Sequence, residues 1–282
     1  MFTTLISTAE LAERLDDPTL ALFDIRHDLA SPESWGQNEY DKAHIPGAVF
    51  MHLDRDLSAA KNGHNGRHPL PTPEACAARF GRAGIDAGKQ VVVYDQGSSS
   101  FAARLWWMLR WLGHDAVAVL DGGFAQWTRE KRPVTADVTV PAPATFTVRR
   151  VTPTVASVGV AASVSRHTLL LVDARAPERF RGEVEPIDPV AGHIPGAVNR
   201  PASQNLTADG VFKSAAKLRT EFAALLGGRP HAEVVHHCGS GVTACVNILA
   251  MEVAGLPGTR LYPGSWSEWI SDRTRPVAKA QR

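Results

Sequence analysis

The chain has 282 residues, of which 44% are hydrophobic and 21% are charged, and its formal net charge is +1. This composition supplies enough apolar side chains for one or two cores, so the fold needs neither disulfides nor metal ions for its stability. A net charge this close to zero gives no sign of a nucleic-acid or membrane partner, and we expect neither.

The three cysteines, Cys76, Cys238 and Cys245, are too few and too scattered for a disulfide framework. The N-terminus has no basic segment leading into an apolar run, as a signal peptide would. No apolar stretch reaches the roughly 18 residues of a membrane-spanning helix. We therefore expect a soluble, cytoplasmic protein.

Apolar runs alternate with helical patterns along the first half of the chain. A helix in TAELAERLD, for which we expect Thr8 as the cap, precedes a short strand at Phe23–Ile25. A loop with HIPGA leads to a strand at Val91–Tyr94 and then to a helix that Gly113 ends. A strand in AVAVL and a helix in FAQW follow. This order predicts an α/β domain, with a mainly parallel sheet covered by helices on both faces.

The second half of the chain repeats the first. The pairs are LFDIRHD at 22–28 with LVDARAP at 171–177, HIPGAV at 44–49 with the same letters at 193–198, and VVVYDQGS at 91–98 with EVVHHCGSG at 233–241. A shared order of elements with a six-residue identity predicts two tandem copies of one domain. We predict an N-terminal domain at 1–138, an extended linker at 139–153 and a C-terminal domain at 154–282.

Cys238 lies where a strand ends and a helix begins. The strand at Val234–His236 runs out at His237, and the helix begins around Thr243 or Ala244. The glycines between them let successive N–H groups converge, which favours an anion at a helix N-terminus. A thiolate in such a place has a pKa of about 3.5–7.5 instead of about 8.5. We therefore predict a nucleophile that a donor can reach at the carboxyl edge of the sheet.

The alternative to a nucleophile is that Cys238 is a small apolar residue of the core, which is common for cysteine. We prefer that interpretation for Cys245, which lies inside the following helix, and for Cys76. Strand alternation sends His236 and His237 to opposite faces, and we expect a structural role for both.

Three chemistries use a cysteine in a strand–loop–helix setting. Phosphate ester hydrolysis needs an arginine six residues after the cysteine, where this chain has Ala244. Thioredoxin-like exchange needs C-x-x-C, and the fourth residue here is Gly241. Sulfur transfer through a persulfide remains, because loop amides and the hydroxyl of Ser240 or Thr243 suit a terminal sulfur anion. No metal or organic cofactor is implied.

The HIPGAV copies, the Asp-x-Arg strand ends and CGSGVTA together resemble the two-domain rhodanese-like sulfurtransferases over essentially the whole chain. The loop is similar to that of 3-mercaptopyruvate sulfurtransferases, since thiosulfate-using relatives carry basic residues there. The resemblance implies a catalytic C-terminal domain and an inactive N-terminal one, in which Asp95 stands at the place of Cys238. It also implies a small-molecule sulfur donor and a thiol, thioredoxin or cyanide acceptor. We expect a monomer.

The resemblance also implies the roles of site residues. Cys238 is catalytic, and Arg179, with Arg181 as an alternative, binds the substrate carboxylate. The backbone of Gly239, Gly241, Val242 and Thr243 contributes to substrate binding. A second arginine of the family is absent, because Glu185-Pro186 is followed by Ile187 and Asp188.

A proton relay is implied as well. Its members are Ser240, His68 and Asp54, with Asp56 as a rival for the carboxylate, and Asp54 would orient His68. The insert between Asp54 and His68 is predicted to be a mobile loop. Two alternatives to a mercaptopyruvate enzyme remain open: a thiosulfate sulfurtransferase, and a non-catalytic carrier of persulfide sulfur.

Overall fold

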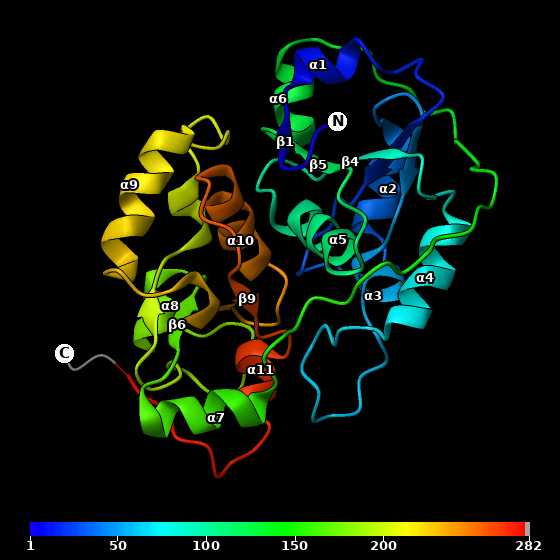
Figure 1. The fold of residues 1–282 in the computed structure, drawn as a ribbon. Helices are drawn as coiled ribbons and strands as arrows, with labels where there is room; N and C mark the ends of the chain where they lie inside the picture. Colours follow the sequence, from blue (N-terminus) through cyan, green and yellow to red (C-terminus); the bar gives the residue numbers. More distant parts are fainter. Residues whose placement is uncertain (280–282) are drawn as a thin grey trace. The chain divides into compact units, whose positions relative to one another are not determined.

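The computed structural model describes residues 1–279, which form two compact units (Figure 1). Unit 1 comprises residues 1–59, 71–152 and 208–212, and unit 2 comprises residues 60–70, 153–207 and the chain from 213 onward. Two short segments, 60–70 and 208–212, therefore group with the unit that the other half of the chain supplies. The domain boundaries expected from the sequence follow simple chain order and stay a prediction.

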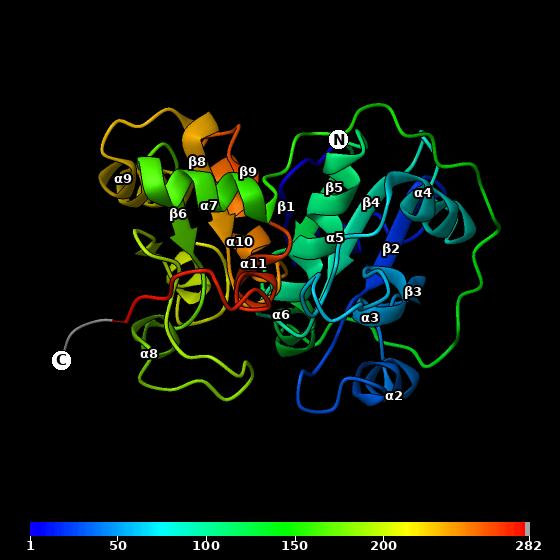
Figure 2. The ribbon, with the colours of Figure 1, turned by 90° about the horizontal axis from the view of Figure 1, so that it is seen from below.

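Unit 1 is built on five parallel strands in the order β1-β5-β4-β2-β3. Leu22, Val92 and Leu120 point to one face and share a core with Leu11 and Trp127, while α5 packs on β4 and β5 (Figure 2). The elements are β1 (Leu5–Ile6), α1 (Thr8–Ala12), β2 (Leu20–Asp24), α2 (Trp35–Lys42), β3 (Ala48–Phe50), α3 (Leu53–Asp56), α4 (Pro73–Arg82), β4 (Gln90–Tyr94), α5 (Ser100–Trp111), β5 (Val117–Leu120) and α6 (Gly123–Arg129).

Unit 2 has four parallel strands in the order β7-β6-β8-β9. Val160 of α7 and Trp266 of α11 share a core with Leu171 and Val235, whereas α10 packs on α9, β8 and β9. The elements are α7 (Ser157–Arg166), β6 (Leu170–Asp173), α8 (Pro177–Arg181), β7 (Val198–Asn199), η1 (Ala202–Asn205), α9 (Ala215–Leu226), η2 (His231–Glu233), β8 (Val234–His237), α10 (Ala244–Val253), β9 (Arg260–Leu261) and α11 (Ser265–Trp269). The predicted α/β class, with two parallel sheets and helices on both faces, is confirmed.

The cap of the first helix differs from the prediction. Ser7, one residue before Thr8, is the N-cap of α1, and it forms a capping box with Glu10. The Glu10 amide donates to Ser7 Oγ at 3.2 Å, and the Ser7 amide donates to Glu10 Oε2 at 2.9 Å. Thr8 is buried, and its hydroxyl donates to Glu130 at 2.6 Å.

The repeated Asp-x-Arg and HIPGAV motifs are linked by hydrogen bonds. In unit 1, Arg26 pairs with Asp24 at 2.7 Å and donates to the carbonyl of Ala43, directly before HIPGAV, at 2.7 Å. In unit 2, Arg175 pairs with Asp173 at 2.7 Å and donates to the carbonyl of Gly192 at 2.8 Å. Each arginine thus ties the end of a strand to the loop that leads into the next one.

The structure agrees with two further predictions, which concern the other cysteines and membrane-spanning helices. Cys76 and Cys245 are fully buried in α4 and α10, as core residues. All three cysteines are free thiols. Among residues 1–279, no helix combines the length and the apolarity that crossing a bilayer requires.

Candidate functional site

The cysteine loop occupies the junction that the sequence predicts. Strand β8 ends at His237 and α10 begins at Ala244, so residues 238–243 connect them. The amide of Cys238 donates to Ser265 Oγ at 3.1 Å. The carbonyls of Cys238 and Gly239 accept from the amides of Trp266 at 3.0 Å and Ser267 at 2.9 Å. The loop is therefore held against the N-terminal turn of α11.

Several backbone donors of this loop have no protein acceptor. Among the described residues, the amides of Gly239, Ser240, Val242 and Thr243 donate no hydrogen bond. They precede α10, whose N-terminus carries a partial positive charge. Unpaired amides that precede a helix N-terminus favour the binding of an anion.

The equivalent loop of unit 1 shows what such an arrangement holds. Asp95, at the position of Cys238, is buried, and its carboxylate accepts hydrogen bonds from four backbone amides: Gly97 at 2.8 Å, Ser99 at 3.0 Å, Phe101 at 3.0 Å and Ala102 at 3.4 Å. Burial raises the pKa of Asp95, and these amides oppose the rise. In unit 1 the amides after the strand thus surround a side-chain carboxylate, and in unit 2 the equivalent position is a cysteine.

Accessibility differs from the sequence-based expectation. We expected a thiol that a donor reaches from solvent, but Cys238 is only 2% exposed and Ser240 only 5%. Both residues are therefore largely shielded from solvent. In surroundings that largely exclude water, electrostatic interactions are stronger.

Glycine at position 241 is required by its geometry. Gly241 has φ of +77°, and a Cβ there would lie 2.1 Å from the carbonyl oxygen of Pro263. Both the backbone conformation and the close approach exclude a side chain.

His68 and Ser240, two predicted relay members, are brought together in unit 2. His68 Nδ1 lies 2.7 Å from Ser240 Oγ, and both residues are 5% exposed. A contact of this length lets a proton pass between hydroxyl and imidazole. Ser240 lies two residues after Cys238, so this contact is part of the cysteine loop.

The segment that carries His68 is anchored, where the sequence predicted a mobile loop. The amide of Arg67 donates to Ser267 Oγ at 3.1 Å, and Ser271 Oγ donates to the carbonyl of His64 at 3.2 Å. A Cβ at Gly66 would lie 3.0 Å from the carbonyl oxygen of Gly264, so the backbones are in close approach. Contacts with α11 and the turn after it thus hold residues 64–67.

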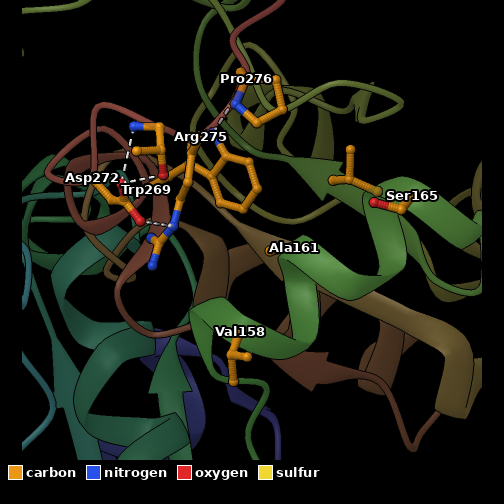
Figure 3. Close-up of a pocket in the computed structure, with 9 residues that line it drawn as sticks. Val158, Ala161, Ser165, Trp269, Asp272, Arg275 and Pro276 are labelled. Atoms are coloured by element: carbon orange, nitrogen blue, oxygen red, sulfur yellow. Dashed lines mark hydrogen bonds and ion pairs between the residues drawn. The ribbon is translucent and has the colours of Figure 1, made fainter.

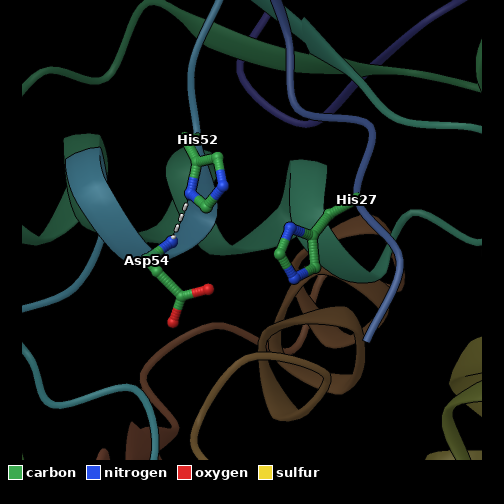
Figure 4. A group of neighbouring side chains, drawn as sticks. All are labelled: His27, His52 and Asp54. Carbon is green, nitrogen blue, oxygen red and sulfur yellow. Dashed lines mark hydrogen bonds between the residues drawn. The ribbon is translucent and has the colours of Figure 1, made fainter. Parts of the chain in front are cut away.

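Asp54, the third predicted relay member, lies in unit 1, near His27 and His52 (Figure 4). Its amide donates to His52 Nδ1 at 3.1 Å at the start of α3. The rival carboxylate, Asp56, accepts from the amide of His52 at 2.7 Å and so closes the first turn of that helix. Because Asp54 and His68 belong to different units, their pairing stays a prediction.

The side chains of His27, His52 and Asp54 have the residue types of a metal site, with ligand atoms within 4.8 Å of one another. The hydrogen bonds of His52 argue against that use. Its Nδ1 accepts from two backbone amides, of Asp54 and Arg55, so the ring proton is on Nε2, which donates to Pro32 at 2.9 Å. Neither nitrogen keeps a free lone pair for a metal.

Arg179, the predicted carboxylate-binding residue, is held by two buried acids. It donates through Nε to Glu185 at 3.1 Å and through Nη2 to Glu185 at 2.7 Å and Asp188 at 3.2 Å. The alternative, Arg181, pairs with Glu183, and its side chain is 42% exposed. The structure therefore places Arg179, and not Arg181, in a partly buried cluster.

Arg67 is a residue that the sequence analysis missed. Its Nη1 donates to Asp188 in an ion pair. A Cβ at Gly239 would lie 2.8 Å from Arg67 Nη2 and 3.7 Å from Arg179 Nη2. The cysteine loop contains no basic residue, yet two guanidinium groups border it. The one available signal was the position of Arg67 directly before His68.

Two pockets of unit 2 differ in their relation to this cluster. One, of about 310 Å³, is lined by Arg67, Asp188 and Ser267, so it borders the cluster. The other, of about 370 Å³, lies between α7 and the segment around Arg275, which pairs with Asp272 at 3.4 Å (Figure 3). No residue of the cysteine loop lines either pocket.

The histidines that precede Cys238 are both fully buried. Burial, with the neighbouring His237, lowers the pKa of His236 to about 3. Burial also lowers the pKa of His237, whose Nδ1 lies 4.0 Å from Asp173. Neither imidazole can exchange a proton directly with solvent, because both are fully buried. This agrees with the structural role expected for the two histidines.

Comparisons with known proteins fit this fold and loop. The family model described as "Rhodanese-like domain" matches residues 7–130 and 160–272. A Pseudomonas aeruginosa protein named "Probable 3-mercaptopyruvate sulfurtransferase" is 48% identical, over 97% of each chain. A Mycobacterium tuberculosis protein named "Putative thiosulfate sulfurtransferase SseB" is 40% identical, over 98% of this chain and 96% of its own. Among solved structures, SseA from Escherichia coli, titled as a 3-mercaptopyruvate sulfotransferase, matches with a TM-score of 0.80 and 33% identity, over 95% of this chain and 100% of its own.

Two rhodanese-like domains, the second with a cysteine in its strand–loop–helix junction, define the class, and the chain belongs to the rhodanese-like family. The family predicted from the sequence is confirmed. Within it, the full-length relatives are sulfurtransferases, and this protein is an enzyme of that class.

Proposed function

We propose that 3-mercaptopyruvate is the sulfur donor and that Cys238 carries the transferred sulfur as a persulfide. The observation that carries the choice of donor is the 2.7 Å contact between His68 Nδ1 and Ser240 Oγ, two residues from the cysteine. Mercaptopyruvate brings a thiol proton that must be moved during transfer, whereas thiosulfate brings none. Relatives with the mercaptopyruvate name at 48% and 36% identity support the same choice.

The chemistry balances without an external oxidant. The Cys238 thiolate attacks the donor sulfur, and an S–S bond forms as the donor C–S bond breaks. The electron pair of the C–S bond stays on carbon, giving the enolate of pyruvate. The proton of the donor thiol ends on the methyl carbon of pyruvate, and the persulfide anion remains on the enzyme. An acceptor thiol or cyanide then takes the outer sulfur and restores the thiolate.

In this proposal each site residue acts at one step. Ser240 and His68 move the thiol proton, and Asp54 orients His68. Arg179 binds the donor carboxylate. The amides of the loop, at Gly239, Gly241, Val242 and Thr243, surround the persulfide anion, as the loop of unit 1 surrounds the Asp95 carboxylate.

The wider setting of the reaction is also proposed. The N-terminal copy is catalytically inactive, because a carboxylate can neither attack sulfur nor carry it as a persulfide. The acceptor is a thiol, thioredoxin or cyanide, no cofactor is required, and the enzyme acts as a cytoplasmic monomer.

Two measurements test the proposal. Initial rates with 3-mercaptopyruvate and with thiosulfate as sole donors should favour mercaptopyruvate, and a clear preference for thiosulfate would overturn the donor. Intact-mass analysis after donor treatment should show one added sulfur, absent from Cys238→Ser and discharged by cyanide. A stable gain that no small acceptor discharges would mean a carrier instead of an enzyme that turns over.

A further inference from the structure

We propose that Arg67 is a specificity-determining residue of the donor site, and that it binds the donor carboxylate together with Arg179. The inference rests on the proposed function and adds a residue to it. It also assigns a purpose to Asp188, whose carboxylate holds the two guanidinium groups side by side.

The first argument is the set of donors that the two arginines leave unused. Arg67 donates to Asp188 through Nη1, and among the described residues its Nη2 has no acceptor. Arg179 uses Nε and Nη2 on Glu185 and Asp188, and its Nη1 has no acceptor among those residues. One guanidinium nitrogen of each arginine is therefore available to an oxygen ligand.

The second argument is where these nitrogens lie. A Cβ at Gly239 would be 2.8 Å from Arg67 Nη2 and 3.8 Å from Arg179 Nη1. Both free nitrogens therefore border the residue that follows Cys238. A three-carbon keto acid with its sulfur at the cysteine can place its carboxylate against them.

The third argument concerns the arginine that the sequence lacks. After Glu185-Pro186 the chain has Ile187 and Asp188, where the family resemblance predicts a second arginine. The structure supplies a guanidinium to the same neighbourhood from a distant segment, since Arg67 pairs with Asp188 itself. Anchoring of residues 64–67 on α11 and the turn after it fixes that guanidinium in place.

The fourth argument is electrostatic. Arg67 and Arg179 carry two positive charges, and Asp188 and Glu185, whose side chains are 2% and 3% exposed, carry two negative ones. The cluster is therefore neutral before a donor binds. It recognises a carboxylate through directed guanidinium hydrogen bonds more than through net charge, which suits a singly charged keto acid better than a dianion.

The test measures binding apart from turnover. In a Cys238→Ser background, 3-mercaptopyruvate binds without reacting, and its Kd is measured by calorimetry with and without Arg67→Ala. Because a hydrogen bond to a charged group contributes about 1.5–3 kcal/mol, we expect the Kd to rise roughly 10- to 100-fold. Arg67→Lys should fall between, since lysine keeps the charge but loses the fork.

Two controls separate recognition from structure. Mercaptoacetone has the thiol and the ketone but no carboxylate, so its KM in the otherwise wild-type enzyme should not respond to Arg67→Ala. Arg229→Ala removes an arginine that pairs with Glu233 at 3.5 Å, before the start of β8, and should leave both donors unaffected.

The outcomes distinguish the two proposals. An unchanged Kd for mercaptopyruvate in the Arg67→Ala background, an equal loss for mercaptoacetone, or no measurable binding to Cys238→Ser would each overturn the role of Arg67. Normal binding that depends on Arg67, in a wild-type enzyme that does not turn mercaptopyruvate over, would instead overturn the proposed function and leave the carboxylate site standing.

Discussion

His68 Nδ1 and Ser240 Oγ lie 2.7 Å apart, although 172 positions separate the two residues in the chain. The contact exists because residues 60–70 fold with unit 2, next to the cysteine loop. It links an imidazole to a hydroxyl near the proposed nucleophile, in a site that excludes most water.

Removing the Ser240 hydroxyl should therefore slow sulfur transfer mainly from mercaptopyruvate, the donor with a thiol proton. General acid–base groups contribute about 10²–10⁴-fold, so Ser240→Ala should lower kcat with mercaptopyruvate by roughly 100-fold or more. The same variant should change the thiosulfate rate by less than about tenfold, because no thiol proton is moved. Ser203→Ala, at an exposed position, is the matched control. Equal losses with both donors would mean that Ser240 supports the loop and not a proton transfer.

The two glycines of the loop should respond differently to alanine. A Cβ at Gly239 meets the flexible end of Arg67 at 2.8 Å, and the backbone there is not in the left-handed region. Gly239→Ala should therefore raise the KM for mercaptopyruvate several-fold while the melting temperature stays within a few degrees. A Cβ at Gly241 meets the backbone of Pro263 at 2.1 Å with φ of +77°. Gly241→Ala should lower stability by roughly 1–3 kcal/mol or more, measured by urea unfolding.

If both variants lose the same stability, the space at Gly239 is not set by a movable side chain. If Gly239→Ala leaves the KM for mercaptopyruvate unchanged, binding of this donor does not depend on the present position of the Arg67 guanidinium.

The parts of the site that the sequence predicts are local ones. Cys238 follows a strand and precedes a helix, so a few neighbouring residues determine its position at the junction of β8 and α10. The repeat is informative here, because in unit 1 the equivalent residue, Asp95, accepts hydrogen bonds from the amides that follow the strand. Short apolar runs between helical patterns likewise predict the parallel sheets, because each run depends only on residues within one strand.

The guanidinium cluster could not be predicted in this way. Arg67 and Asp188 are 121 positions apart, and their pairing depends on how residues 60–70 fold. The sequence shows a loop without basic residues and a missing arginine, but it does not show that Arg67 borders the same loop. The anchoring of residues 64–67 was also invisible, because glycine and asparagine in a segment indicate a loop without indicating what it packs on.

Breaking the buried pair at the end of β6 should unfold the enzyme more readily. The Asp173 and Arg175 side chains are 0% and 1% exposed, and Arg175 also holds the carbonyl of Gly192. Asp173→Asn leaves the buried Arg175 with only the longer 3.4 Å ion pair to Glu185, so it should cost about 3–5 kcal/mol in free energy of unfolding. Asp272→Asn, whose side chain is 43% exposed beside Arg275, should cost less than about 1 kcal/mol. Chemical denaturation of both variants decides, and a loss at Asp173 no larger than the loss at Asp272 would contradict this view of the pair.

The buried histidine before Cys238 predicts how stability depends on pH. Burial lowers the pKa of His236 from 6.5 to about 3, so between these values the unfolded chain binds a proton that the folded chain does not. Above about pH 6.5 the titration of His236 does not affect stability. As the pH falls below that value, the free energy of unfolding decreases, by roughly 2 kcal/mol at pH 5. Both ring nitrogens lack a hydrogen-bond partner among the described residues, so His236→Leu loses no such bond.

The variant should therefore lose less stability than the wild type between pH 7 and pH 5, measured by urea unfolding at each pH. His237, whose pKa burial also lowers, should keep part of the dependence in both proteins. His64→Leu, at an exposed histidine, should retain the full wild-type slope. Identical slopes for the wild type and His236→Leu would show that the imidazole of His236 gains its proton without unfolding, and that its burial does not oppose the charge.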